Sequence, residues 1–372
     1  MIYFDNAATT FPKPRCVIDE LNRCILEYCG NPGRSSHYLS RRAEEEIYTA
    51  RENISHFIGA NNPESVVFTY NATYALNIAI KTFITTPCHI ITSDVEHNAI
   101  VRPLEKLKKC LGIRISEFSS NGDIEDQIDS MIQADTKGIV STIESNVTGK
   151  HIPLSMLSKA ASKHGLFLII DASQALGHHI INVKETPCDV LCAPTHKGIF
   201  GIQGGGFAWF KENERKESYI EGGSGSDSIN PYMPRFLPEG YEAGTLSTPA
   251  IVTASRGVQF VTAIGINVIE KHLTFLSSEL AERIKAIKSA TLYHSENGIL
   301  SFNIGSCSSS IVADFLDSRN ICVRSGLHCA PKAHMALGTI DRGTVRASLS
   351  VFNTLKEIDS FYSAISDFSR IY

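Results

Sequence analysis

Two ionisable residues, Asp171 and Lys197, follow short apolar runs. Asp171 comes directly after residues 166–170, and Lys197 comes shortly after residues 190–192. A carboxylate at the end of a buried strand is unfavourable unless it meets a cation or a strong donor, and the protonated nitrogen of a pyridine ring is such a partner. A lysine at a strand end, followed by a glycine-rich segment, is a candidate Schiff-base lysine. Taken singly, a capping aspartate and a surface lysine are the simpler interpretations.

A third polar segment follows the apolar residues 66–69, where Asn71, Ala72 and Thr73 lead into an expected helix. The amides at a helix N-terminus, together with the Thr73 hydroxyl, form an anion site suited to phosphate. Asn or Thr at this place is also an ordinary helix cap. The combination is more informative. A phosphate site, a buried aspartate and a lysine in this order describe a pocket for pyridoxal phosphate.

Two more polar groups follow apolar runs: His97 after residues 89–92, and the set 144–146, which includes Asn146, after residues 138–142. Ligands of open α/β sheets bind beyond the carboxyl ends of the strands. His97 is therefore a candidate base, or a flat ring against a ligand, and the set 144–146 is placed to reach the same pocket. A lone histidine is more often a structural hydrogen-bonding residue.

The C-terminal region adds a nucleophile and a cation. Cys329 lies in a loop-like segment, where Arg324 and His328 would favour its thiolate. The alternative interpretation of Cys329 is a buried cysteine at a turn. Arg346 lies within an apolar strand, and a buried arginine usually has an anionic partner. A substrate carboxylate is one such partner, and a structural salt bridge to Asp or Glu is the other.

The elements that must position these residues form an α/β pattern. Short β-rich runs, most of them separated by helix-length segments, predict βαβ units and a mostly parallel sheet buried on both faces. From about residue 265 the pattern changes to a long amphipathic helix over 268–289 and a smaller α+β unit, with strands near 299–303, 321–324 and 344–349. We expect a large domain over 15–262 and a small domain formed by 1–14 and 263–372.

The bulk composition excludes several classes. A chain of 372 residues with 43% hydrophobic content has enough apolar surface for large buried cores, and its net charge of −4 makes nucleic acid an unexpected partner. No apolar run approaches a bilayer span, and the N-terminus has no signal-peptide pattern, so we expect a cytoplasmic protein that does not bind membranes. The ten cysteines are scattered, and Cys188 and Cys192 lack a second pair, so no metal site is expected.

Together these residues resemble the class V aminotransferase-like cysteine desulfurases and the related selenocysteine lyases, nearly from end to end. The resemblance begins at residues 3–10, Tyr-Phe-Asp-Asn-Ala-Ala-Thr-Thr, and continues through residues 30–37 and the strand-end residues above. It closes at residues 344–348 and 351–354. The motif of residues 324–330, Arg-Ser-Gly-Leu-His-Cys-Ala, is similar to the branch with a short, ordered cysteine loop.

The resemblance implies fold type I of the pyridoxal-phosphate enzymes, a homodimer, and a role for each matching residue. Lys197 would carry the cofactor, Asp171 would pair with its pyridine nitrogen, Gln174 with its phenolic oxygen, and His97 would stack on its ring and belong to the catalytic group. Ala72, Thr73 and His196 would hold the phosphate, with Thr245 supplied by a second subunit. Arg346 and Asn146 would bind the substrate carboxylate, and Cys329 would receive the sulfur.

This predicts a cysteine desulfurase, which forms a persulfide on Cys329, releases L-alanine and passes sulfur to an acceptor protein or a small thiol. Two positions depart from the family pattern: Pro194 stands where relatives have Ser or Thr, and Leu327 where a second histidine is common. The alternatives are a selenocysteine lyase acting on L-selenocysteine, another fold-type-I lyase or aminotransferase, and a degenerate scaffold protein. A scaffold is disfavoured because Lys197, Asp171 and Arg346 are all present.

Overall fold

The computed structural model describes the whole chain except residues 34, 212–216, 218, 227–228 and 372. Its largest element is a seven-stranded sheet with the strand order β2-β8-β7-β6-β5-β3-β4. The strands are β2 (Val66–Thr69), β3 (His89–Ser93), β4 (Arg114–Phe118), β5 (Thr136–Thr142), β6 (Phe167–Asp171), β7 (Val190–Pro194) and β8 (Gly206–Phe210). Strand β8 pairs antiparallel with β2 and with β7, and the other described strand pairs of this sheet are parallel. The predicted mixed, mostly parallel sheet is confirmed.

Helices cover both faces of this sheet, which is why its central strands carry apolar residues on both faces. Along β6, Leu168 and Ile170 face one hydrophobic core, and Ile169 between them faces another. The first core also holds side chains of α2, α5, α6 and α7, and the second holds those of α3 and α4. These helices are α2 (Tyr38–Phe57), α3 (Ala72–Phe83), α4 (Asn98–Leu111), α5 (Ile124–Met131), α6 (Leu154–His164) and α7 (Thr248–Ile264).

The C-terminal elements form a separate core around a four-stranded antiparallel sheet with the order β12-β13-β10-β9. Its elements are α8 (Ile266–Lys285), β9 (Ala290–Glu296), β10 (Ile299–Ile304), α9 (Ser309–Asp317), β12 (Arg324–Gly326), β13 (Thr344–Ser348) and α11 (Leu355–Ile371). The short helix α10 (Pro331–Ala336) follows β12 in the chain, but its Ala333 belongs to a core of the large sheet. At the start of α11, the Thr354 amide donates to Glu357 Oε2 over 2.8 Å, and the Glu357 amide donates to Thr354 Oγ1. This is the predicted capping box.

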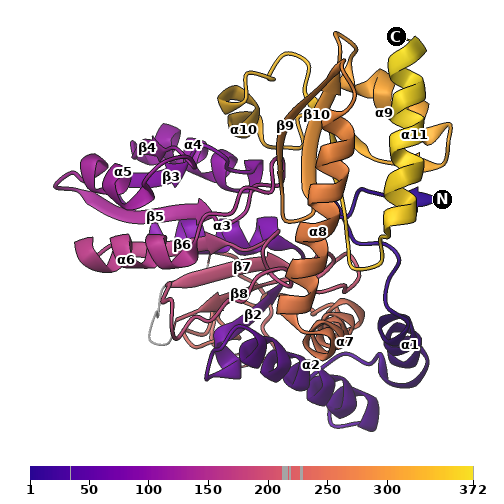
Figure 1. Cartoon of the computed structure of the whole chain (residues 1–372). Coiled ribbons are helices and arrows are strands. Elements are labelled where there is room, and N and C mark those ends of the chain that lie inside the picture. Colours follow the sequence, from indigo (N-terminus) through magenta and orange to yellow (C-terminus); the bar gives the residue numbers. More distant parts are fainter. Residues whose placement is uncertain (34, 212–216, 218, 227–228, 372) are drawn as a thin grey trace.

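The N-terminal segment belongs spatially to the C-terminal unit (Figure 1). Strand β1 (Ile2–Tyr3) pairs in parallel with β11 (Ile321–Cys322), and α1 (Arg15–Arg23) then leads to the large sheet. The predicted single strand near 321–324 is therefore wrong, because β11 and β12 lie in different sheets. The domain boundaries given above stay a prediction.

A helix that spans a membrane must be both long and apolar. Among the described residues, no helix taken alone is both long and apolar enough to span a bilayer. Only α7 and α8 together pass by length and composition, and they are bent by 79°.

Candidate active site

A cavity of about 180 Å³ lies where the strands of the large sheet end. Because parallel strands bring their carboxyl ends to one edge, the polar residues that follow different strands meet there. Eight of the predicted site residues line this cavity: Ala72, Thr73, His97, Asn146, Asp171, Gln174, His196 and Lys197. The edge of the sheet thus collects residues separated by more than a hundred positions in the chain.

Lys197 lies three residues beyond β7 on a loop that is pinned to the rest of the fold. The Thr195 hydroxyl donates to the carbonyl of Ile202 over 2.7 Å, and the Thr10 hydroxyl donates to the Lys197 carbonyl over 3.2 Å. Burial lowers the pKa of the Lys197 amine to about 8, the charge of Asp171 opposes this shift, and the charge of Arg346 adds to it. A substantial fraction of the amine is therefore neutral and nucleophilic at mildly alkaline pH.

Asp171 and Gln174 are held by short local contacts. Asp171 ends β6 and is 3% exposed, and its Oδ1 accepts from the Ser173 amide over 2.9 Å. The Gln174 side chain donates from Nε2 to the Ala7 carbonyl over 3.0 Å, so the N-terminal segment helps to fix it. Both residues place an oxygen-bearing group against the same cavity as the Lys197 amine.

The N-terminus of α3 opens into the cavity. The Asn71 side chain caps the helix by accepting from the Tyr74 amide over 3.0 Å, while Ala72 and Thr73 form its first turn. The first amides of a helix have no intrahelical acceptor and favour an anion. The nearby His196 has a buried Nδ1 with no hydrogen-bond partner among the described residues. A donor set for a phosphate group is therefore present, although Pro194 at the end of β7 supplies no hydroxyl.

His97 serves as the N-cap of α4. Its Nδ1 accepts from the Ala99 amide over 3.0 Å, which places the proton of the neutral ring on Nε2. Burial lowers the pKa of His97 to about 4, and the charge of Asp171 only partly offsets this effect. The ring is therefore neutral at physiological pH, which suits a flat aromatic contact.

Arg346 is buried, with 1% of its surface exposed, and it already has an anionic partner. Its Nη2 lies 2.7 Å from Asp5 Oδ1, and its Nη1 donates to the Asn146 carbonyl over 2.9 Å. The salt bridge that the sequence left open as an alternative is thus present. The sequence does not reveal Asp5 as the partner of Arg346, because the two residues are 341 positions apart in the chain. Arg346 reaches the cavity through Asn146, since it does not line the cavity itself.

Cys329 is exposed, and its backbone is docked beside the cavity. The Asn98 amide donates to the Cys329 carbonyl over 2.7 Å, and Asn146 Nδ2 donates to the His328 carbonyl over 2.7 Å. Both His328 and Cys329 have positive φ angles, of 51° and 56°. This left-handed turn is unusual for residues other than glycine. It gives the loop a defined shape and ties the thiol-bearing residue to two residues adjoining or lining the cavity.

The expectation that His328 stabilises a thiolate by its charge is wrong. Its ring is buried between neutral partners, with Nδ1 3.2 Å from His334 Nε2 and Nε2 3.3 Å from the Arg324 carbonyl. Burial lowers the pKa of His328 to about 2, with a further lowering by the charge of Arg346, so the ring is neutral. His328 shapes the loop, and Arg324 is the remaining cation of the pair.

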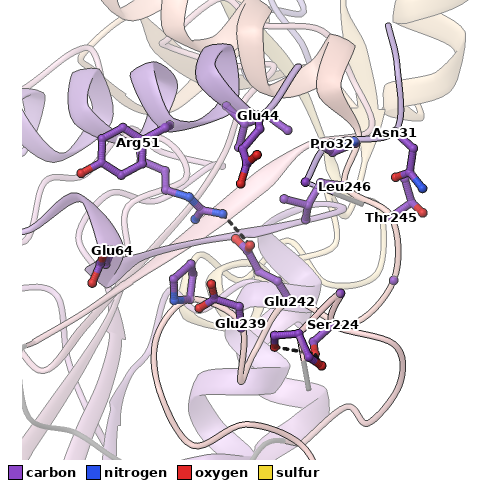
Figure 2. A pocket seen from close by; sticks show the side chains of 17 residues that line it. Asn31, Pro32, Glu44, Arg51, Glu64, Ser224, Glu239, Glu242, Thr245 and Leu246 are labelled. Carbon is purple, nitrogen blue, oxygen red and sulfur yellow. Dashed lines mark hydrogen bonds and ion pairs between the residues drawn. The ribbon is translucent and has the colours of Figure 1, made fainter. Parts of the chain in front are cut away.

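Thr245 lies elsewhere within this chain. Figure 2 shows it at the wall of a second cavity, of about 350 Å³, near the buried ion pair of Arg51 with Glu242. It does not line the cavity of Lys197 within this chain, and its predicted role at the phosphate stays a prediction. Glu144 does line that cavity and is 1% exposed. Glu144 belongs to the polar set 144–146, which follows a buried strand and is expected from the sequence to reach the pocket, but the sequence gives Glu144 no specific role.

Comparisons with known proteins match this geometry. The family model of the class-V aminotransferases covers residues 2–361. A probable cysteine desulfurase of Methanothermobacter thermautotrophicus is 31% identical over 96% of this chain and 92% of the relative. A cysteine desulfurase of Escherichia coli O9:H4 is 28% identical over 100% and 94%. The apo structure of a cysteine desulfurase from Thermococcus onnurineus NA1 has a TM-score of 0.92, with 29% identity over 100% of this chain and 95% of that one.

Proposed function

This chain belongs to the class-V aminotransferase family, and we propose that it is a pyridoxal-phosphate-dependent cysteine desulfurase that forms a persulfide on Cys329 and releases L-alanine. The observation that carries this proposal is the docking of the Cys329 loop. The backbone contacts of Cys329 with Asn98 and of His328 with Asn146 hold a thiol beside the cavity of Lys197. An aminotransferase needs no thiol at this place.

The cavity residues fit the cofactor of the family. We propose that Lys197 carries pyridoxal phosphate, that Asp171 faces its pyridine nitrogen and Gln174 its phenolic oxygen, and that His97 stacks on the ring. The first amides of α3, at Ala72 and Thr73, and the unpartnered Nδ1 of His196 match a phosphate. When bound, pyridoxal phosphate supplies an electron sink for the electrons left when a proton leaves the Cα of an amino acid.

The residues of the chain supply the remaining steps. Lys197, whose pKa burial lowers to about 8, is a suitable base for the Cα proton of cysteine. We propose that Arg346 and Asn146 hold the substrate carboxylate. The Cys329 thiolate attacks the substrate sulfur, the new S–S bond forms as the Cβ–S bond breaks, and the carbon fragment is protonated to alanine. A second thiol, on an acceptor protein or a small molecule, then removes the outer sulfur.

The proposal includes an oligomeric state and a cellular location. We infer a homodimer in which Thr245 of one chain reaches the phosphate of the other. Thr245, Tyr70 and Tyr74 line a common cavity near the start of α3, and both tyrosines are about half exposed, which suits a subunit contact. All ten cysteines are free, which supports a reducing, cytoplasmic environment. Light scattering should give the mass of two chains, and Thr245→Ala should weaken cofactor binding without altering that mass.

The direct test is product formation from L-cysteine and from L-selenocysteine. The proposal expects one alanine per sulfide in the presence of a thiol reductant. It expects no dependence on an added keto acid, which an aminotransferase would require. Release of selenide without turnover of cysteine would assign the chain to the selenocysteine lyases instead. Absence of alanine from both substrates would contradict both activities.

A further inference from the structure

Beside the active-site cavity, three potential metal ligands converge: Glu144, His151 and His179. One ligand atom from each lies within 4.8 Å of the others. Glu144 and His151 face each other across an isolated bridge in the segment after β5, and His179 comes from the segment after β6. The two imidazole rings have centroids 4.2 Å apart. The cluster adjoins the catalytic residues because Glu144 also lines the cavity of Lys197.

The polar atoms of this cluster lack the partners that buried groups normally have. Glu144 is 1% and His179 is 9% exposed. Both carboxylate oxygens of Glu144, Nε2 of His179 and Nδ1 of His151 have no hydrogen-bond partner among the described residues. His179 Nε2 and Glu144 Oε2 lie 3.3 Å apart, within ion-pair range but without hydrogen-bond alignment. Unsatisfied buried polar atoms are rare, so four at one point indicate a missing partner.

A second carboxylate, that of Glu270, contacts the His179 ring on the side away from Glu144. Glu270 Oε1 lies 3.0 Å from His179 Nδ1, which leaves Nε2 of the same ring directed at Glu144. Histidine ligands of metals commonly donate their other ring N–H to a carboxylate, which fixes the tautomer and the ring orientation. A simple ion pair between Glu144 and His179 explains neither the unpartnered Nδ1 of His151 nor the second oxygen of Glu144.

We propose that Glu144, His151 and His179 bind a divalent first-row transition metal ion, Zn²⁺ in particular, in the wall of the active-site cavity, and that Glu270 positions His179. Two imidazoles and a carboxylate are a ligand set that suits Zn²⁺, with a fourth position left for water. The absence of a metal site expected from the sequence rested on cysteine spacing alone. The ligands here are spread over 36 positions and match no short motif.

The test uses the holoenzyme, treated with a chelator, dialysed without cysteine and titrated with Zn²⁺ by calorimetry and with Co²⁺ by visible absorbance. The expected result is one ion per chain, with ligand-field bands of imidazole and carboxylate coordination. His151→Gln and His179→Gln should each weaken Zn²⁺ binding by at least about tenfold, and Glu270→Gln by about 10–100-fold. The matched control is His164→Gln, which removes a histidine at the C-terminal end of α6 that pairs with Asp129 outside the cluster, and it should leave the affinity unchanged.

Three outcomes would overturn the proposal. The first is a wild-type enzyme that binds neither ion stoichiometrically. The second is undiminished binding in His151→Gln and His179→Gln, with circular dichroism and cofactor absorbance establishing that both variants are folded. If either variant fails to fold, Glu270→Gln decides, because Glu270 is more exposed than the three ligands, with 41% of its side chain accessible. The third is a thiolate-to-Co²⁺ charge-transfer band, which would assign the ion to the cysteines.

Discussion

At the scale of single residues, the contacts of Arg346 raise a question about its role. Its guanidinium already pairs with Asp5 and with the Asn146 carbonyl, so it contributes to the structure as well as to the proposed recognition of substrate. Its buried Nε has no hydrogen-bond partner among the described residues. Breaking a buried ion pair is destabilising by about 3–5 kcal/mol when one charge is left alone. Stability and catalysis must therefore be measured separately.

Two substitutions separate these roles. Arg346→Lys should lower kcat/KM for cysteine by about tenfold or more, a loss of roughly 1.5–3 kcal/mol, because an ammonium cannot form two parallel bonds to a carboxylate. Asp5→Asn removes the same ion pair but keeps the guanidinium, so it should lose stability with a smaller loss of kcat/KM. Equal losses of kcat/KM in the two variants would mean that Arg346 acts only through the structure.

The amine of Lys197 is predicted to react at an unusually low pH. Burial lowers its pKa to about 8, so the neutral, reactive form should appear with a midpoint near that pH in cofactor-free protein. An ordinary lysine would have its midpoint near about 10.4. Trace acetylation across a pH series, followed by peptide mass spectrometry, measures this midpoint, and the exposed lysines of the same sample give the reference. A midpoint for Lys197 that coincides with theirs would rule out the predicted desolvation.

At the scale of elements, the N-terminus of α3 links helix stability to phosphate binding. Asn71→Ala removes the acceptor for the Tyr74 amide and should destabilise the protein by about 1 kcal/mol. Asn71→Asp keeps the cap but adds a negative charge where the phosphate is expected. It should retain the melting temperature and weaken cofactor binding. Thermal unfolding and cofactor titration of the apoprotein measure the two effects, and cofactor affinity equal to wild type in Asn71→Asp would contradict a phosphate site here.

The sequence predicts those strands that show as a short run of buried apolar side chains. Strands β2, β3, β5, β6, β7 and β8 each contain a short, mostly buried apolar run, and the sequence identifies them by it. The edge strand β4 was missed because Arg114 and Glu117 are exposed and interrupt its apolar pattern. Strand β9 was missed because its residues are only partly buried. The long helix was expected over 268–289, whereas α8 spans Ile266–Lys285.

Site residues, too, are predictable where a local pattern marks them and not where their contacts come from distant parts of the chain. Those that stand at or shortly after strand ends, such as Asp171 and Lys197, are identified by local pattern and resemblance, and they share one cavity. Pairings that depend on chain segments far apart were not predictable. The contact of Arg346 with Asp5 and the neutral environment of His328 both arise from tertiary packing, which no local window of sequence contains.

At the scale of the whole molecule, the large sheet and the C-terminal unit have to meet correctly for the proposed chemistry. The cavity is formed by the large sheet, whereas Cys329 and Arg346 belong to the C-terminal unit, which Figure 1 shows beside that sheet. The hydrogen bonds that join them beside the cavity include those of the Asn98 amide to the Cys329 carbonyl, of Asn146 to the His328 carbonyl, and of Arg346 to the Asn146 carbonyl. Asn146 takes part in two of these bonds, so it connects the cysteine loop to the proposed carboxylate site.

The measurement that tests the central claim most directly is mass spectrometry of the wild-type enzyme after one turnover with L-cysteine, without reductant. The account predicts a mass gain of one sulfur atom, mapped to Cys329 and to none of the other nine cysteines. Cys329→Ser should keep the cofactor and lose nearly all desulfurase turnover. A sulfur atom mapped to another cysteine, or full cysteine turnover in Cys329→Ser, would contradict the account.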